Sequence, residues 1–365
     1  MTATEAPLLE VDGLVVEIPT RRGTLRPVDG VTFRIDAGEI VGVVGESGAG
    51  KSITGAAIIG LLERPARIAA GSVRLLGEPL ESLSEAELRR VRGGRIGTVF
   101  QDPSTSLNPL LTVGDQLAET AALHLGLSRG EARARALAAL VDVGIPAAAE
   151  RLDAYPHEFS GGMRQRVVIA LALIGEPELV IADEPTTALD VSVQAQVLTL
   201  LRKLCTERGT GVMLVTHDMG VIAETTDRTV VLYAGRVAET GATEALLTSP
   251  AHPYSEGLVA STPTPAAGAA EGRRLHQIPG SMPGLLDVPE GCAFHPRCPH
   301  AMAVCRERRP PPVAVGATEA WCWLHVEGRG DGTVDRVGEG AAVDGSAGAR
   351  GGRPAAAPRA AGTAG

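Results

Sequence analysis

The chain has 365 residues, and its 34 basic and 43 acidic side chains give a net charge of −9. An acidic balance disfavours non-specific nucleic-acid binding, which usually requires a basic face. Apolar runs such as residues 167–173 are far shorter than the roughly 20 residues that cross a bilayer, and the first seven residues carry no targeting pattern. We therefore expect a cytoplasmic protein without a membrane span of its own.

Short apolar runs of β type alternate along the chain with stretches of helical pattern. This alternation is typical of an α/β fold with a largely parallel sheet. The run at 40–44 is apolar throughout, as expected for a strand that is buried on both faces. In chain order we expect strands at 8–18, 31–35, 40–44, 179–182, 212–216, 229–233 and 236–239, and helices at 53–62, 129–143 and 162–174.

Composition divides the chain into three parts. Residues 1–245 carry the α/β pattern, with a helical subdomain inserted at about 105–178. Residues 246–327 form a Pro-rich extension that holds four of the five cysteines. Residues 328–365 are rich in Gly and Ala and have almost no large apolar side chains, so we expect a disordered tail there.

The Gly-rich turn after the strand at 40–44 fits the phosphate-binding pattern G-x-x-x-x-G-K-[ST], and a helical stretch follows it, as the pattern requires. Its glycines let backbone N–H groups approach phosphate oxygens, and the helix N-terminus adds a favourable field. Lys51, one of only two lysines with Lys203, is expected to reach the β- and γ-phosphates, where the planar fork of Arg would be too wide. The Ser52 hydroxyl is expected to coordinate Mg²⁺. The motif consists of Gly45, Glu46, Ser47, Gly48, Ala49, Gly50, Lys51 and Ser52.

Two carboxylates end the apolar strand expected at 179–182. Asp183 is placed to hold Mg²⁺ through water, and Glu184 to orient and deprotonate an attacking water. A strand that ends in Asp-Glu is weak support on its own. It becomes strong about 130 residues downstream of a phosphate-binding motif.

Further polar motifs occur in an informative order. Ser160-Gly161-Gly162 alone indicates only a helix N-cap with a loop. The full series in the chain is the phosphate motif, Gln101, Ser160-Gly161-Gly162, Asp183-Glu184, Asp190 and His217. Over about residues 8–245 this series resembles the ATP-binding cassette (ABC) ATPases. The resemblance implies a P-loop NTPase fold of ABC type, with an antiparallel β subdomain and an inserted helical subdomain.

The same resemblance implies roles for these residues. Gln101 would link Mg²⁺ and the water to the helical subdomain, and His217 would lie at the γ-phosphate. The expected catalytic residues are Lys51, Gln101, Glu184 and His217. Mg²⁺ is expected on Ser52, Gln101 and Asp183, and ATP on the phosphate motif together with Ser160, Gly161, Gly162 and Asp190.

Two positions depart from the family pattern. Met163 stands where a Gln commonly closes the signature that begins at Ser160, although the backbone amides there can still cradle a phosphate. Ile18 aligns with the aromatic residue that often stacks on adenine. Because this family closes ATP between the P-loop of one cassette and the signature of another, we expect a second ABC ATPase subunit as partner, in a heterodimer.

The extension carries its own set of motifs, namely His252-Pro253-Tyr254, Ile278-Pro279-Gly280, Gly291-Cys292-Ala293-Phe294-His295-Pro296-Arg297-Cys298-Pro299, Cys305 and Trp321-Cys322-Trp323-Leu324. Together they resemble the C-terminal extension of ATP-binding subunits of oligopeptide and dipeptide ABC importers. The resemblance implies two transmembrane permease subunits as partners, an extracytoplasmic substrate-binding protein as an indirect one, and a peripheral place on the cytoplasmic face of the membrane. Nickel importers are close relatives within this superfamily.

The cysteines of the extension are Cys292, Cys298, Cys305 and Cys322, spaced C-x5-C-x6-C-x16-C. Without a secretory signal, metal or cluster ligation is favoured over disulfides. Four thiolates suit a [4Fe–4S] cluster or tetrahedral Zn²⁺. The spacing lacks the paired C-x-x-C typical of structural zinc, so the cluster is favoured, with unligated buried thiols as the main alternative. Cys205 lies in a helical pattern and is expected to be an inert apolar residue.

The sequence thus predicts an ATPase subunit that powers import of di- and oligopeptides. One alternative is the same role in a nickel or other small-solute importer. A second is a soluble ABC ATPase that acts on nucleic acid or ribosomes. The stretch between Ser52 and Ser160 is too short for the long coiled coils of chromosome-maintenance ATPases, and the acidic charge also argues against nucleic acid as a partner.

Overall fold

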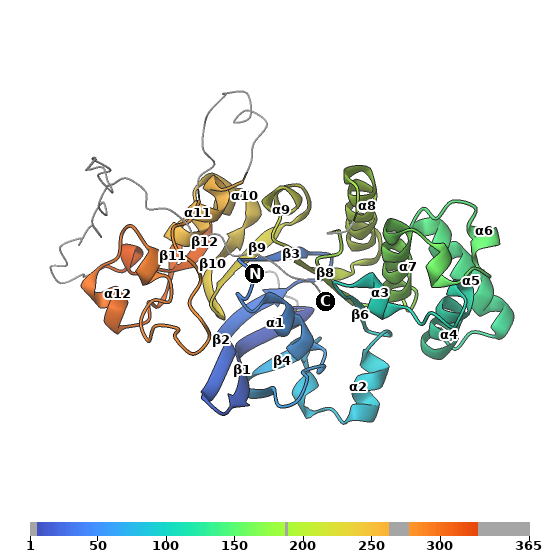
Figure 1. Ribbon diagram of the computed structural model, residues 1–365, viewed down its shortest axis with the longest axis horizontal. Coiled ribbons are helices and arrows are strands. Elements are labelled where there is room, and N and C mark those ends of the chain that lie inside the picture. The colour runs from blue at the N-terminus through green and yellow to red at the C-terminus, as the bar shows by residue number, and fades with distance from the viewer. Residues whose placement is uncertain (1–5, 187–188, 263–276, 328–365) are drawn as a thin grey trace, which may run out of the picture.

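The computed structural model describes residues 6–186, 189–262 and 277–327, and it is built on two β-sheets (Figure 1). The strands are β1 (Leu9–Thr20), β2 (Gly23–Ile35), β3 (Ile40–Val44), β4 (Arg67–Leu75), β5 (Glu78–Pro79), β6 (Ile96–Val99), β7 (Leu179–Asp183), β8 (Gly211–Val215), β9 (Arg228–Tyr233), β10 (Arg236–Ala242), β11 (Pro312–Val315) and β12 (Thr318–Trp321). The helices are α1 (Lys51–Ile58), α2 (Glu85–Val91), α3 (Pro103–Ser106), α4 (Val113–Leu125), α5 (Arg129–Asp142), α6 (Ala148–Arg151), α7 (Gly161–Leu173), α8 (Val191–Arg208), α9 (Met219–Thr225), α10 (Thr243–Thr248), α11 (Pro253–Ala260) and α12 (Ala303–Glu307).

The larger sheet has eight strands in the order β11-β12-β10-β9-β3-β8-β7-β6. Its strands from β9 to β6 run parallel, whereas β10, β12 and β11 continue it in antiparallel fashion. The smaller sheet is antiparallel in the order β2-β1-β4-β5. A sheet of parallel strands brings the carboxyl ends of those strands to one edge, where α/β proteins bind their ligands.

The parallel strands are buried on both faces because successive side chains point to opposite sides. On β3, Ile40 belongs to an apolar cluster shared with α4, α5, α7 and α8. Its neighbours Val41 and Val43 belong to a second cluster, shared with β1, β2 and α1. The larger sheet therefore packs against helices on one face and against the antiparallel sheet on the other. In Figure 1, α8 and α9 lie above the larger sheet, the antiparallel sheet lies below it, and the helical lobe formed by α4–α7 lies to the right.

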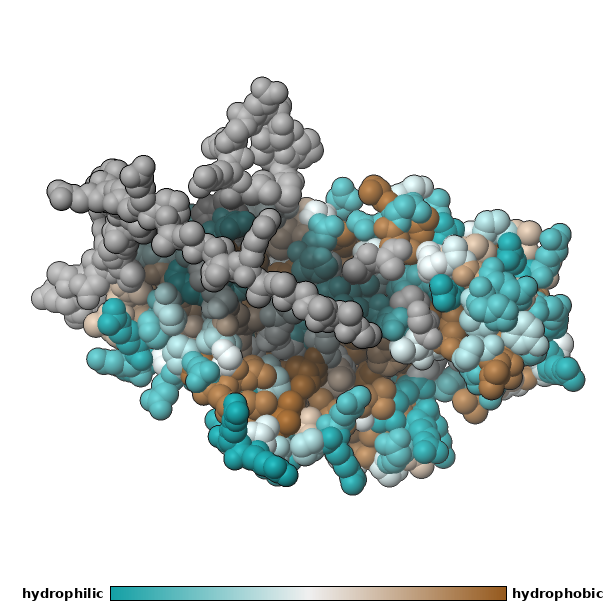
Figure 2. All heavy atoms as spheres, in the orientation of Figure 1, coloured by the Kyte–Doolittle hydropathy of each residue, from teal (hydrophilic) through white to brown (hydrophobic). Residues whose placement is uncertain are grey.

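The segment after β10 packs against the end of the larger sheet and contributes β12 and β11 to it. A third cluster joins Tyr233 at the end of β9 to Tyr254 and Phe294 of this segment, with ring centroids 4.7 and 5.2 Å from the Tyr233 ring. On the face shown in Figure 2, apolar residues gather near β2 and α1, whereas hydrophilic residues predominate on the rim of the helical lobe. Within the described residues, no helix combines the length and apolarity needed to cross a bilayer.

The strand at 40–44 is confirmed as β3, and the strand at 179–182 is confirmed as β7 with one residue added. The strand at 31–35 is only the end of β2, which starts at Gly23. The helix expected at 53–62 is misplaced at both ends: α1 begins at Lys51 and ends at Ile58, and Gly60 follows with a left-handed φ of 65°. The tail at 328–365 lies outside the described residues.

A candidate nucleotide site at the strand ends

A cavity of about 330 Å³ opens at the carboxyl ends of β3, β6, β7 and β8. The phosphate motif follows β3, Gln101 follows β6, Glu184 follows β7, and His217 follows β8. The parallel order of these strands brings together residues that lie far apart in the chain. The lining residues are Pro27, Ser47, Gly48, Gly50, Lys51, Ser52, Ile53, Gln101, Glu184, His217 and Leu285.

The phosphate motif requires glycine at specific points of its turn. Gly45 has a φ of 153°, and a Cβ atom there would lie 2.2 Å from the Leu232 carbonyl oxygen. Gly50 has a φ of 102°, and its Cβ would lie 2.4 Å from the Pro27 carbonyl oxygen. Side chains larger than hydrogen would therefore push the loop off β9 and β2. The tight fit lets α1 begin directly at the loop, with its N-terminus at the cavity.

Lys51 is the first residue of α1, and its side chain is buried, with 7% of the residue exposed. Its Nζ donates hydrogen bonds to the carbonyl oxygens of Gly45 at 2.9 Å and Glu46 at 3.1 Å. Burial lowers the pKa of Lys51, and the nearby carboxylates of Glu184 and Asp183 oppose that shift. The ammonium is thus held at the cavity by its own loop, ready to exchange carbonyl partners for phosphate oxygens.

Asp183 at the end of β7 meets the donor requirements of a magnesium site. Its side chain accepts a hydrogen bond from the Ser52 hydroxyl, and its buried Oδ1 atom has no hydrogen-bond partner among the described residues. Burial raises the pKa of Asp183, Glu184 adds to this shift, and Ser52 and Lys51 counter it. Mg²⁺ prefers oxygen donors and typically takes only one or two protein carboxylates. A bound Mg²⁺ would satisfy the buried oxygen and the hydroxyl together.

Glu184 is held from two sides by residues of neighbouring strand ends. The Gln101 Nε2 group donates a hydrogen bond to its Oε2 at 3.2 Å, and His217 Nδ1 lies 3.0 Å from its Oε1. The Glu184 side chain is 14% exposed, whereas that of His217 is 62% exposed. Glu184 also adopts a φ of 49°, a left-handed conformation that is uncommon for a residue with a Cβ and frequent at functional sites. The carboxylate is therefore fixed at the cavity in one orientation.

The signature residues and Asp190 occupy a different place. Ser160 is the N-cap of α7, accepting a hydrogen bond from the Met163 N–H at 3.3 Å, and Asp190 caps α8 through Val193. None of these residues is among those described as lining the cavity at Lys51. A single chain therefore brings together the phosphate motif, Gln101, Glu184 and His217, but it leaves its own signature outside that cavity.

Glu46 differs from the other residues of the motif. Its N–H donates to the Tyr254 hydroxyl at 2.8 Å, and its carboxylate pairs with Arg297, so neither faces the cavity. Ile18 is a half-buried residue of β1 and is also outside the cavity lining. Sequence reasoning missed Pro27, Ile53 and Leu285 as lining residues, and an apolar residue carries no motif that would reveal such a role.

The extension cysteines lie close to one another but do not form a metal-binding group. Within the described residues no set of three or more His, Cys, Asp or Glu side chains is arranged to hold a metal ion, and no disulfide joins the cysteines. Burial raises the pKa of both Cys292 and Cys298 to about 11, with smaller effects from neighbouring thiols, including Cys305. As arranged, these side chains fit neither a cluster nor zinc. Burial likewise raises the pKa of Cys205 to about 12, in keeping with the expected inert thiol.

Comparisons with known proteins also support a nucleotide site of the ABC type. The model of the ABC transporter family matches residues 28–187, and that of the oligopeptide/dipeptide transporter C-terminal region matches residues 238–305. The chain is 48% identical over 314 residues to the oligopeptide transport ATP-binding protein OppD of Salmonella typhimurium, covering 85% of this chain and 92% of that protein. It is 45% identical over 303 residues to the dipeptide transport ATP-binding protein DppD of Escherichia coli, covering 83% and 92%.

Solved structures share the fold. A dimeric ATP-binding cassette in a post-hydrolysis state, bound to ADP and Pi, superposes with a TM-score of 0.59 and 30% identity, covering 64% of this chain and 98% of that one. A cassette that is part of the cbiONQ ABC transporter complex of Clostridium perfringens superposes with a TM-score of 0.57 and 28% identity, covering 67% and 92%.

Proposed function

The chain belongs to the ATP-binding subunits of oligopeptide and dipeptide ABC transporters, and we propose that its strand-end cavity binds and hydrolyses ATP to power peptide import. The ABC ATPase fold expected from the sequence is confirmed by the similarity to solved cassettes. The observation that supports the site most strongly is the meeting of Lys51, Glu184 and His217 in one cavity, from the ends of β3, β7 and β8.

The binding step follows from the residues at the start of α1. The Lys51 ammonium and the N–H groups at the helix N-terminus would bind the phosphate oxygens of ATP. Ser52 and Asp183 would hold Mg²⁺, with Gln101, which lines the same cavity as Ser52, as the third proposed ligand. When bound, Mg²⁺ neutralises charge on the phosphates and polarises the bond that breaks. Binding would draw Lys51 Nζ away from the carbonyl groups of Gly45 and Glu46.

The hydrolytic step rests on Glu184. Its carboxylate would accept a proton from the water that attacks the γ-phosphate, while Gln101 and His217 keep it aimed at that water. His217, largely exposed, would reach the γ-phosphate once ATP is bound. Catalysis would come from positioning and charge neutralisation, without a covalent intermediate.

The test of this site is Glu184→Gln, which keeps the shape and the hydrogen-bonding reach of the side chain. We expect ATP binding to persist and hydrolysis to fall by about 10²–10⁴-fold, the usual contribution of a positioned acid or base. Mixed with its partner cassette, the variant should also accumulate as a closed dimer in ATP, measured by size-exclusion chromatography. Hydrolysis at the wild-type rate would refute the assignment of Glu184.

A second cassette is needed to complete the site. Ser160, Gly161, Gly162 and Asp190 lie outside the cavity of their own chain, and the similar solved cassette is a dimer. We propose that they face the ATP held by a partner cassette, in a heterodimer. Two bound ATP molecules would close the pair, and hydrolysis would reopen it.

Permease subunits are the second proposed partner. Phe100, next to Gln101, is 46% exposed, and Leu110 and Leu111 on the same connection between β6 and α4 are 82% and 38% exposed. Exposed apolar side chains mark a docking surface where they gather in one patch. We propose that two transmembrane permease subunits dock here, which would place the chain peripherally on the cytoplasmic face of the membrane and link it indirectly to an extracytoplasmic binding protein.

Peptides are favoured over nickel as the transported solute because the similar proteins named above transport oligopeptides and dipeptides. Reconstitution with the permease and its binding protein would test this: peptide should stimulate ATP hydrolysis, and stimulation by nickel alone would overturn the peptide assignment.

We propose the division into an ATP-binding unit at 1–245, with a helical subdomain at about 105–178 formed mainly by α4–α7, and an extension at 246–327. A [4Fe–4S] cluster on the four cysteines of the extension stays a prediction, and it would require a different arrangement of these side chains from the one described. Iron analysis and visible absorption of protein purified without oxygen would test it, and colourless, iron-free protein would overturn it.

A further inference from the structure

The extension is attached directly to the phosphate-binding loop. Arg297 Nη1 and Nη2 contact the two carboxylate oxygens of Glu46 at 2.5 and 3.0 Å, across 251 positions of sequence. The Arg297 side chain is only 4% exposed, and that of Glu46 is 32% exposed. Such two-pronged pairs fix orientation as well as distance. Tyr254 adds a third bond, from the Glu46 N–H to its hydroxyl at 2.8 Å.

Arg297 is itself rigidly placed. Its Nε group donates a hydrogen bond to the Pro279 carbonyl oxygen at 2.7 Å, and its guanidinium lies 5.7 Å from the ring centroid of Tyr233 and 5.8 Å from that of Phe294. The hydrogen bonds with Glu46 are the main reason why the pKa of Arg297 is raised. Because the guanidinium is fixed by these contacts, its ion pair also fixes the position of Glu46 in the phosphate-binding loop.

The position of Glu46 gives this contact a functional consequence. Glu46 directly follows Gly45, which packs against Leu232, and it begins the part of the loop that ends at Lys51. The Lys51 Nζ group also donates a hydrogen bond to the Glu46 carbonyl oxygen at 3.1 Å. The part of the extension that precedes Arg297 also reaches the cavity at Lys51. Leu285 is one of the lining residues, and Met282 Cε lies 3.5 Å from where a Cβ of Gly48 would be.

We propose that Arg297 is a positioning residue for ATP binding, which acts through Glu46 to hold the phosphate-binding loop in its receptive conformation. The nucleotide site thus depends on the extension, 251 residues away in sequence, as well as on the cassette motifs. This inference rests on the proposed ATPase function. Loss of the guanidinium would leave an unpaired Glu46 carboxylate beside a site for a highly negative ligand, and the two negative charges would repel each other.

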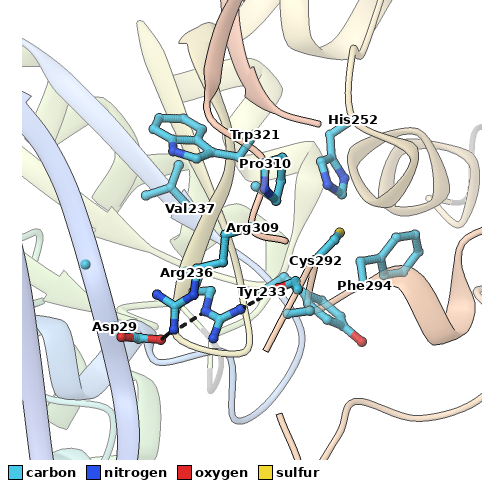
Figure 3. Close-up of a pocket in the computed structure, with 14 residues that line it drawn as sticks. Asp29, Tyr233, Arg236, Val237, His252, Cys292, Phe294, Arg309, Pro310 and Trp321 are labelled. Carbon is cyan, nitrogen blue, oxygen red and sulfur yellow. Dashed lines mark hydrogen bonds and ion pairs between the residues drawn. The ribbon is translucent and has the colours of Figure 1, made fainter. Parts of the chain in front are cut away.

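The chain offers a matched control for general loosening of the extension. Arg309 of the extension contacts Asp29 of β2 at 2.6 Å, and Arg236 contacts the same carboxylate at 3.0 Å. Figure 3 shows this group beside a separate cavity of about 220 Å³, which shares no lining residue with the cavity at Lys51. Arg309→Gln therefore breaks an ion pair between extension and cassette without touching the phosphate-binding loop.

The experiment measures affinity for trinitrophenyl-ATP with Mg²⁺ on the full chain, together with KM and kcat for ATP in the assembled transporter. Arg297→Gln should weaken binding by at least about tenfold, because removing the buried guanidinium leaves the partly buried Glu46 carboxylate uncompensated. KM should rise more than kcat falls. Arg297→Lys should restore part of the affinity, and Arg309→Gln should stay within about twofold of wild type, as usual for a partly exposed pair.

The double variant Arg297→Gln/Glu46→Gln tests directly whether Arg297 acts through Glu46. If Arg297 acts through Glu46, it should bind ATP better than Arg297→Gln alone, because the unpaired carboxylate is gone. Equal losses in Arg297→Gln and Arg309→Gln, or additive losses in the double variant, would overturn the proposal. Should Arg297→Gln fail to fold, Glu46→Gln decides: affinity equal to wild type would also overturn it. A wild-type chain that bound no nucleotide would overturn the proposed function itself, whereas wild-type binding with unaffected variants would overturn only the role of Arg297.

Discussion

Replacing Lys51 by Met should separate nucleotide binding from stability. The Met side chain has nearly the same length and shape but no charge. It removes two hydrogen bonds to the carbonyl groups of Gly45 and Glu46, each worth about 1.5–3 kcal/mol for a charged donor. It also removes the cost of burying an ammonium, a cost shown by the lowered pKa of Lys51. Because the two effects oppose each other, we expect the free energy of unfolding to change by no more than about 1.5 kcal/mol, the usual limit for a volume-conserving swap between apolar residues.

The lowered pKa of Lys51 means that its charge opposes folding. A lysine whose folded-state pKa is below its unfolded value binds its proton less tightly when folded, so at neutral pH its charge opposes folding. The unliganded Lys51→Met variant should therefore melt within a few degrees of wild type. ATP should behave differently, because the variant offers no ammonium to the phosphates.

The measurement is thermal melting with and without Mg²⁺ and ATP. A ligand at a hundred times its Kd stabilises the native state by about 2.7 kcal/mol, which raises the melting temperature of a chain of this size by about 4 °C. Wild type should show this shift, and Lys51→Met should show almost none. Lys203→Met is the matched control, since Lys203 is 60% exposed and should leave both quantities unchanged. A full ATP shift in Lys51→Met, or an unliganded melting temperature lower by ten degrees or more, would refute the reasoning.

Three further changes test other parts of the structure. Gly45→Ala should abolish ATP binding, measured by the same melting shift, because the Cβ atom of Ala would lie 2.2 Å from the Leu232 carbonyl oxygen. The control is Gly126→Ala, at a position that also has a positive φ but has open space around it. This control should lower the free energy of unfolding by only about 1 kcal/mol and should still bind ATP. Burial lowers the pKa of His252 to about 3. The native state should therefore lose stability as the pH falls below about 6.5, the pKa of His in the unfolded chain, and the loss should reach about 2 kcal/mol at pH 5. Denaturant titrations should show a smaller pH effect in His252→Asn, and an equal effect would contradict this assignment to His252. Leu110→Asp should preserve the ATP shift and weaken co-purification with the permease, and unchanged co-purification would argue against docking there.

Sequence patterns revealed the parts of the site that depend on local chemistry. β3 and β7 were identifiable because every side chain on a doubly covered strand must be apolar, and Lys51 because its loop has a fixed spacing. Asp183 and Glu184 were identifiable as polar residues that end such a strand. In each case the signal lies within a few consecutive residues.

Contacts between distant segments were not predictable in the same way. The Arg297–Glu46 pair joins a loop of the extension to a loop of the cassette, and neither sequence indicates its partner. The strands β11 and β12 were missed because each has only four residues, and β11 begins with Pro312, a residue that weakens a strand pattern. Their pairing with β10 depends on the tertiary fold and has no periodic pattern to reveal it.

The pairing of β12 with β10 has a consequence for self-association. In the full chain, Glu239, Thr240 and Gly241 of β10 are paired with β12, and the sheet ends at β11, whose first residue is a proline. Proline at an edge discourages a strand of another molecule from adding to the sheet. A chain shortened to end near residue 245 would leave β10 as a seven-residue bare edge and would deprive the Glu239 carboxylate of its bonds to the N–H groups of Ala251 and His252. The extension therefore also keeps the sheet from pairing with neighbouring molecules, and the shortened chain should aggregate.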